Sequence, residues 1–144
     1  MGTATVRWVS GKKFIGTDST NHSVVLSTPD EGIGMKPSEL LLVALAACTA
    51  VDVVEILRKK RIDLTTVEIS ASSHQEPNPH WMFRKIHLVY RLRGTGLTEK
   101  IAANAVRLSE EKYCSVAATV RGVAEISTEI VILPQNEPAK VAAD

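Results

Sequence analysis

The sequence has little of what marks several common classes of protein. Only two cysteines are present, which excludes a disulfide-rich scaffold. The net charge of +1 gives no electrostatic footprint for nucleic acid or for a membrane surface. No phosphate-binding loop and no Gly-x-Ser-x-Gly elbow occurs. None of the four histidines has a Cys or His at ligand spacing, so we expect no metal site among them: His22, His74, His80 and His87.

Targeting and membrane-spanning segments are not apparent either. The first seven residues contain no apolar stretch of the secretory type. The longest uninterrupted apolar run, Leu40 to Cys48, is well short of the ~18 residues that cross a bilayer. We therefore expect a cytoplasmic protein without membrane or nucleic-acid partners. The length predicts one domain, residues 1–133, that buries about two-thirds of its unfolded surface, followed by a disordered tail, residues 134–144.

The first half of the sequence predicts a long apolar helix. Pro37 suits the first helical turn, where a missing N–H is no loss. The basic run Arg58 to Arg61 places positive charge at the negative end of the helix dipole. A helix that is apolar on all sides, as Leu40 to Cys48 would be, must be enclosed on every side. One small domain does this with difficulty, so we infer that a second copy of the chain encloses part of the helix.

The remaining segments predict an α+β fold. The chain should begin with a three-stranded β-meander over residues 3–27. After the central helix, residues 64–74 and 81–92 alternate in hydropathy and are separated by Glu76-Pro77-Asn78-Pro79, which is typical of a long β-hairpin. Thr98 is a suitable N-cap for a second helix that extends to about Tyr113. A short helix over residues 115–121 and a final strand over residues 123–133 complete the fold, without a βαβ array.

The two thiols are the side chains best suited to chemistry. Free cysteines are more often packing residues than reactive ones. Cys48 lies too deep in the helix to gain from its N-terminal dipole. Asp52 and Glu55 share its helical face and oppose ionisation unless each is paired or turned away. An active Cys48 therefore needs a cation from elsewhere in the fold. Cys114, at the end of the second helix, would suit a resolving thiol, an arrangement that is suggestive and not specific.

Two blocks of sequence resemble one known family. Pro37-Ser38-Glu39-Leu40-Leu41, with Ala46-Ala47-Cys48 and Asp52-Val53 after it, and Glu111-Lys112-Tyr113-Cys114-Ser115-Val116 together look like the OsmC/Ohr family. The resemblance covers nearly the whole chain. It implies an α+β fold in which two long helices lie back to back in an intertwined homodimer. It also implies a cysteine-based peroxidase that acts on organic hydroperoxides.

The resemblance also implies roles for individual residues. Cys48 matches the peroxidatic cysteine and Cys114 the resolving one, so that a Cys48 sulfenic acid would be followed by a Cys48–Cys114 disulfide, which a dithiol reductant reopens. No cofactor or metal is implied. Where characterised members carry an activating Arg, this chain offers Lys12 and Lys13. The Glu that follows the helix-opening Pro in those members is displaced by one residue here, to Glu39.

A second interpretation stays open at this point. The same dimer would serve as a non-enzymatic module that binds a small apolar or thiol-containing ligand, with both cysteines merely buried. The absent Arg and the displaced Glu favour this interpretation. The distance between the sulfurs discriminates the two, because redox use needs both sulfurs within a few Å of each other.

Overall fold

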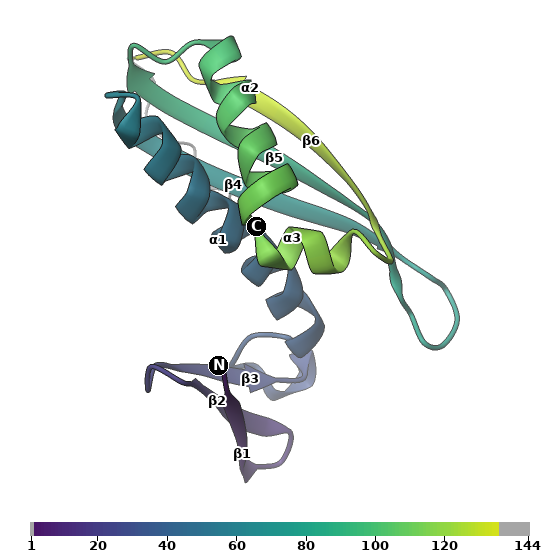
Figure 1. The fold of residues 1–144 in the computed structure, drawn as a ribbon. Coiled ribbons are helices and arrows are strands. Elements are labelled where there is room, and N and C mark those ends of the chain that lie inside the picture. Colours follow the sequence, from purple (N-terminus) through teal and green to yellow (C-terminus); the bar gives the residue numbers. More distant parts are fainter. Residues whose placement is uncertain (1, 136–144) are drawn as a thin grey trace. The chain divides into compact units, whose positions relative to one another are not determined.

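A computed structural model describes residues 2–135. The chain divides into two compact units, residues 1–43 and residues 44–144, and the division falls inside the long helix (Figure 1). That the chain forms a single domain stays a prediction.

The first unit is the predicted three-stranded meander. Strands β1 (Ala4–Ser10), β2 (Lys13–Asp18) and β3 (Ser23–Ser27) pair in that order, both pairs antiparallel. A single 3-10 turn, η1 (Pro29–Glu31), follows β3. Every residue of β1 is exposed within this chain, including Trp8 at 68%. The apolar side chains of the first strand are therefore not used to form a core in the first unit.

Helix α1 (Pro37–Lys59) begins at the predicted proline and ends in the predicted basic run. Its end is fixed by two backbone hydrogen bonds, from Arg61 N to Arg58 O at 2.9 Å and from Ile62 N to Leu57 O at 3.0 Å. This is the Schellman pattern, which requires a left-handed residue just past the helix. Arg61 occupies that position with φ of 61°, where glycine is the usual choice.

The second unit is built on a three-stranded sheet. Strands β4 (Asp63–Gln75) and β5 (Phe83–Thr95) form the predicted hairpin and pair antiparallel along their length. Strand β6 (Glu125–Ile132) pairs with the other edge of β5 and runs parallel to it. β5 is therefore the central strand. A parallel pair needs a crossover, which the helices between β5 and β6 provide.

Three helical segments form that crossover. Helix α2 (Glu99–Leu108) begins at the predicted N-cap, where Thr98 Oγ1 accepts a hydrogen bond of 3.2 Å from Ile101 N. The predicted helix extended to Tyr113, but α-helical geometry ends at Leu108 and a π-helical turn, η2 (Ser109–Tyr113), continues the chain. Cys114 then begins the short helix α3 (Ser115–Val120).

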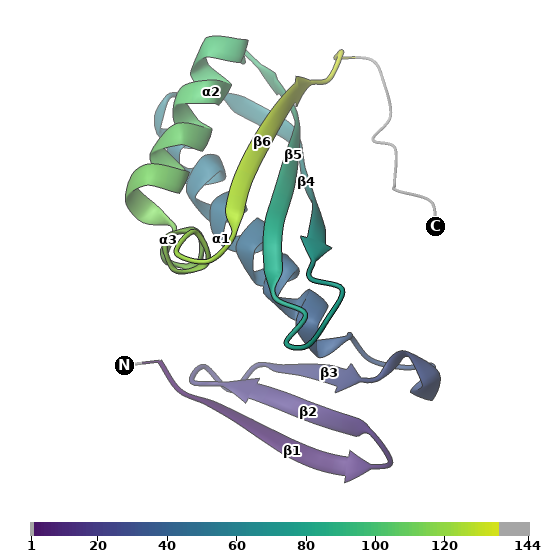
Figure 2. The ribbon, with the colours of Figure 1, turned by 90° about the vertical axis from the view of Figure 1, so that its right-hand side faces the viewer.

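The core of the second unit lies between the sheet and the helices, which cover one face of it (Figure 2). Alternate residues of β5 supply the sheet side, and residues four apart on α1 supply one stripe of the helix side. The buried side chains are Ile86, Leu88, Tyr90 and Leu92 on β5, Leu45, Thr49, Val53 and Leu57 on α1, and Ala102, Ala105 and Val106 on α2. Tyr90 is the largest of these fully buried side chains.

Two residues of the predicted tail are held by the sheet. Pro134 O accepts a hydrogen bond of 2.8 Å from Arg93 Nε, and Gln135 Nε2 donates one of 3.1 Å to Gly94 O. The rest of the predicted tail, residues 136–144, lies outside the described residues.

Helix α1 is also long and apolar enough, by length and composition alone, to cross a membrane. The expectation of no membrane-spanning segment rests on the unbroken apolar run alone, which is much shorter than the helix. The same test is passed by core helices of soluble proteins, so it is weak support for a membrane span. Only 22% of its most apolar 18-residue window is buried within this chain.

Candidate functional site

The two thiols that are 66 residues apart in sequence meet in the second unit. The Sγ atoms of Cys48 and Cys114 and one carboxylate oxygen of Asp52 all lie within 4.8 Å of one another. Cys48 and Asp52 are one helical turn apart on α1, and Cys114 comes from the junction between η2 and α3. The sequence predicted a Cys48–Cys114 pair only through family resemblance, and the geometry shows that the two sulfurs are close.

The π-helical turn η2 explains how Cys114 comes to face α1. The backbone N of Cys114 donates a hydrogen bond of 2.8 Å to Ser109 O, five residues earlier. The additional residue in this turn rotates the following chain relative to a continuous α-helix. Cys114 thereby leaves the helical path and becomes the N-cap of α3, with its Sγ accepting a hydrogen bond of 3.3 Å from Ala117 N.

The two thiols differ in exposure. Cys114 is 2% exposed, whereas Cys48 is half-buried. Burial, followed by a hydrogen bond with the Cys48 thiol, raises the pKa of Cys114 to about 11, and the backbone N–H of Ala117 offsets this only in part. A thiol of that pKa is ionised to about one part in ten thousand at pH 7. Cys114 is therefore a protonated, enclosed thiol, and Cys48 is the one that a solvent-borne reagent meets first.

The carboxylate beside the sulfurs is itself held in place. Asp52 Oδ2 accepts a hydrogen bond of 2.9 Å from Ser109 Oγ, and Ser109 is fully buried. The second carboxylate on this helical face, Glu55, is paired with Lys59 Nζ at 2.7 Å. Both carboxylates can be singled out from the sequence, whereas Ser109 cannot, because it belongs to no motif and is 57 residues from Asp52.

A buried polar cluster lies beside this site. Burial raises the pKa of Tyr90 well above its usual range, a shift that the nearby Thr49 hydroxyl opposes. Burial also raises the pKa of the Glu110 carboxyl, against the opposing charge of Arg121, whose Nη2 lies 3.6 Å from Glu110 Oε2. The hydroxyl of Tyr90 and the Oε1 of Glu110 have no hydrogen-bond partner among the described atoms. The sequence contained no signal for this cluster.

The other predicted site residues lie in the first unit. Lys12 Nζ is 2.7 Å from Asp30 Oδ2, and Lys13 Nζ is 3.2 Å from Glu31 Oε2. The hydrogen bond from Lys12 is the largest cause that lowers the pKa of Asp30 to about 2. Each lysine is thus paired with a carboxylate of its own unit. Their predicted role as activating cations stays a prediction.

Glu39, the last predicted site residue, lies in the first turn of α1. Its Oε1 is 3.4 Å from Lys36 Nζ, and both side chains are exposed. Its predicted role toward Cys48 likewise stays a prediction.

Comparison with known proteins identifies the family. A sequence model of the OsmC-like protein family matches residues 29–129. The chain belongs to the OsmC-like family. It is 34% identical over 124 residues to protein YhfA of Escherichia coli K12, a match that covers 86% of this chain and 92% of YhfA. The resemblance inferred from the two cysteine blocks is therefore confirmed.

Solved structures confirm the OsmC-like fold. A hypothetical protein from Aquifex aeolicus superposes with a TM-score of 0.79 at 29% identity, over 93% of this chain and 98% of that one. The organic hydroperoxide resistance protein OhrB of Bacillus subtilis superposes with a TM-score of 0.62 at 19% identity, over 91% and 98% of the two chains. The predicted α+β architecture is thus correct, with the π-helical turn as the detail that the prediction missed.

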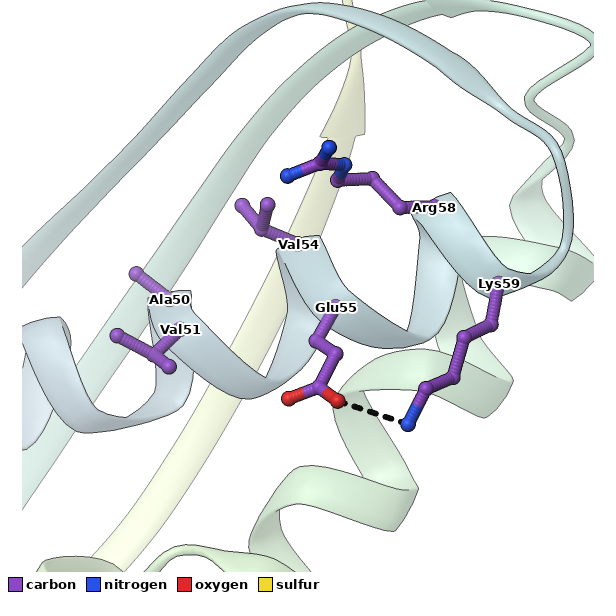
Figure 3. A pocket seen from close by; sticks show the side chains of 6 residues that line it. All are labelled: Ala50, Val51, Val54, Glu55, Arg58 and Lys59. Carbon is purple, nitrogen blue, oxygen red and sulfur yellow. Dashed lines mark ion pairs between the residues drawn. The ribbon is translucent and has the colours of Figure 1, made fainter.

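Hollows border α1 in the second unit of this OsmC-like chain. One, of about 410 Å³, has Asp52 in its wall together with Ile56, Leu108 and Tyr113, and with Lys59 and Lys60. Another is a shallow, largely apolar groove along the helix itself, lined by Ala50, Val51, Val54, Glu55, Arg58 and Lys59 (Figure 3). In Figure 3 the Glu55–Lys59 ion pair lies beside the apolar side chains of this groove.

Proposed function

We propose that this OsmC-like protein is a thiol-dependent peroxidase that reduces organic hydroperoxides with Cys48 and Cys114. The observation that carries the proposal is the distance of at most 4.8 Å between two sulfurs of unequal exposure. The half-buried Cys48 thiol is accessible to a substrate. The enclosed, protonated Cys114 thiol beside it stays reduced until the second step. The similarity to OhrB of Bacillus subtilis, an organic hydroperoxide resistance protein, supports the same class of substrate.

The reaction follows from the difference between the two thiols. The thiolate of Cys48 attacks the distal oxygen of the hydroperoxide, the O–O bond breaks, and the leaving alkoxide takes a proton to become an alcohol. Cys48 is thereby oxidised to a sulfenic acid. The Cys114 sulfur then attacks the Cys48 sulfur, and the sulfenic oxygen leaves as water with the Cys114 proton. A dithiol reductant reopens the resulting disulfide and is itself oxidised, which returns both thiols.

The proposal includes a homodimer in the cytoplasm. Val51 on α1 is 65% exposed within the chain, whereas Leu45, Val53 and Leu57 on the same helix are buried in the core. An apolar helix face left open to water on one chain is stabilised when a second copy covers it. We therefore expect two copies of α1 to lie against each other. A cytoplasmic location accords with the need for reduced thiols between turnovers.

Mass spectrometry after a stoichiometric dose of an organic hydroperoxide tests the proposal. We expect a Cys48–Cys114 disulfide in the wild type and a trapped Cys48 sulfenic acid in Cys114→Ser. Cys48→Ser is the matched control, because it leaves the less exposed thiol alone and should take up no oxygen. Two untouched thiols in the wild type would contradict the proposal.

One observation favours a second candidate, the non-enzymatic binding module. Lys12 and Lys13, which stand in place of the family Arg, are paired with Asp30 and Glu31. A paired lysine lends less positive charge to a distant thiol than a free one. Under this alternative, the same dose of hydroperoxide leaves both thiols intact, while a small apolar or thiol ligand still binds the dimer.

A further inference from the structure

The thiol pair lies next to the carboxylate of Asp52. Two sulfurs and the Asp52 carboxylate lie within 4.8 Å of one another. Within the described part of the second unit, no hydrogen bond or ion pair joins a Lys or Arg nitrogen to any of these three groups. Groups of like charge at such short distance oppose one another's ionisation. A divalent cation between them would remove that opposition.

We propose that the reduced site binds one zinc ion through Cys48 Sγ, Cys114 Sγ and the carboxylate of Asp52. Zinc bonds to thiolate sulfur at ~2.3 Å and to carboxylate oxygen at ~2.0–2.2 Å, so two ligand atoms on a tetrahedral ion are ~3.6–3.8 Å apart. Atoms that already lie within 4.8 Å of one another need to approach by ~1 Å. Small rotations of three side chains supply such a change without movement of the backbone.

The set of donor atoms selects zinc over other common ions. Two soft sulfurs are poor ligands for calcium or magnesium, which prefer oxygen. Two thiolates with one carboxylate suit a borderline-soft ion in tetrahedral geometry, which leaves a fourth position for water or another ligand. The spacing of Cys48 and Asp52 also fits, since residues four apart on a helix project from the same face.

Two of the three proposed ligands accept hydrogen bonds from neighbouring groups, as ligands in metal sites usually do. Ser109 Oγ donates to Asp52 Oδ2 and so fixes the direction of the carboxylate. Ala117 N donates to Cys114 Sγ, a bond that stabilises sulfur as a thiolate. Hydrogen bonds of this kind orient metal ligands, and their loss typically weakens metal affinity 10- to 100-fold. Neither donor belongs to a ligand residue.

Zinc binding and disulfide formation exclude each other at this site. Both sulfurs must be reduced and deprotonated to bind the ion, whereas a disulfide leaves neither sulfur as a thiolate ligand. A bound zinc ion would keep the thiols from oxidants, and their oxidation by a hydroperoxide would release it. The binding itself does not depend on the proposed peroxidase activity, so each proposal can fail without the other.

Metal titration of the reduced, metal-free protein under nitrogen tests the inference. Cobalt(II) serves as the spectroscopic probe, and zinc is then measured by competition with a chromophoric chelator. We expect one ion per chain, a thiolate-to-cobalt charge-transfer band in the near ultraviolet, and visible bands of four-coordinate cobalt. Zinc should also protect both thiols of the wild type from alkylation, as read by mass spectrometry. Protein oxidised to the disulfide beforehand should bind neither ion.

Variants separate this site from binding elsewhere on the chain. Ser109→Ala should weaken zinc about 10- to 100-fold, and Asp52→Asn and Cys48→Ser should weaken it further. Glu55→Gln is the matched control, because it removes an exposed carboxylate from the same helix and should leave the affinity unchanged. Wild-type affinity in Asp52→Asn, a cobalt spectrum without the charge-transfer band, or thiols that zinc does not protect would each overturn the inference. The protection assay uses the wild type and so stands even where a variant fails to fold.

Discussion

Ser109 Oγ and Asp52 Oδ2, 2.9 Å apart, connect the turn that precedes one cysteine to the helix that carries the other. Ser109 is fully buried, and its backbone oxygen also accepts the hydrogen bond that turns Cys114 toward α1. One residue therefore orients both the carboxylate and the enclosed thiol. The position of the site depends on this serine as much as on the cysteines themselves.

Ser109→Ala should lower the free energy of unfolding of the reduced protein by about 1–2 kcal/mol. The variant removes a hydrogen bond to a charged group and leaves Asp52 without its donor. Denaturant unfolding at one fixed protein concentration measures the change. Ser115→Ala is the control, because Ser115 is exposed and its side chain makes no described hydrogen bond. Equal effects of the two substitutions would mean that the Ser109–Asp52 bond adds no stability.

Glu110→Gln should stabilise the protein increasingly, relative to the wild type, as pH rises above the ordinary carboxyl pKa of about 4.3. Burial raises the pKa of Glu110 in the folded state, so the native protein holds this proton more tightly than the unfolded chain does. The wild type therefore loses stability as pH rises from the ordinary carboxyl pKa through the folded value. Glutamine does not ionise, so the variant does not lose stability in this way as pH rises.

Thermal unfolding across this pH range, on the wild type and Glu110→Gln, measures the difference. Glu111→Gln is the control, since it removes a neighbouring carboxylate that is 61% exposed and carries no burial cost of that size. A constant difference between wild type and Glu110→Gln at all pH values would contradict the prediction.

Arg61→Gly should raise the free energy of unfolding by about 1 kcal/mol. Arg61 closes α1 with φ of 61°, a left-handed conformation that costs a residue with a Cβ about 1–2 kcal/mol. Glycine avoids that cost but loses more entropy on folding, which reduces the gain. Lys60→Gly tests the opposite case at the adjacent position, where φ is not positive, and should destabilise. A loss of stability in Arg61→Gly would show that the arginine side chain matters more than its backbone.

Val51→Lys should weaken the proposed dimer by at least about 100-fold. A lysine in the middle of an apolar contact places an unpaired charge away from water, which costs several kcal/mol. Sedimentation velocity over a range of protein concentrations measures the change. Val123→Lys is the control, since Val123 is similarly exposed at 56% but lies in the turn before β6. If Val51→Lys sediments as the wild type does, α1 is not the contact between copies.

The elements that depend on local chemistry were predictable from the sequence. Pro37 marks the start of α1, and Thr98 marks the start of α2, because each acts within one turn of its own position. The alternation in β5 is equally local, since a strand buried on one face must repeat every two residues. Family resemblance added the pairing of Cys48 with Cys114, which no local pattern indicates.

The parts that depend on tertiary contacts were not predictable. The π-helical turn at Ser109 forms where the chain must both end α2 and direct Cys114 to α1, and helix propensity favoured a continuous helix to Tyr113. The ion pairs of Lys12 and Lys13 join residues that are 18 apart in sequence, so the charges can be recognised from the sequence but their partners cannot. The charge state of Cys114 likewise follows from burial, which spacing alone does not reveal.

Because β6 pairs with β5, the sheet of the second unit cannot be completed during synthesis until β6 has been made. The central strand β5 ends at Thr95, but its second neighbour ends only at Ile132. At about 5–20 residues per second, the ribosome needs roughly 2–7 s to add the intervening chain. Throughout that interval one side of β5 has backbone N–H and C=O groups without their final partners, a template to which other chains can pair. The nascent protein is therefore most exposed to aggregation after its hairpin exists and before its last strand arrives.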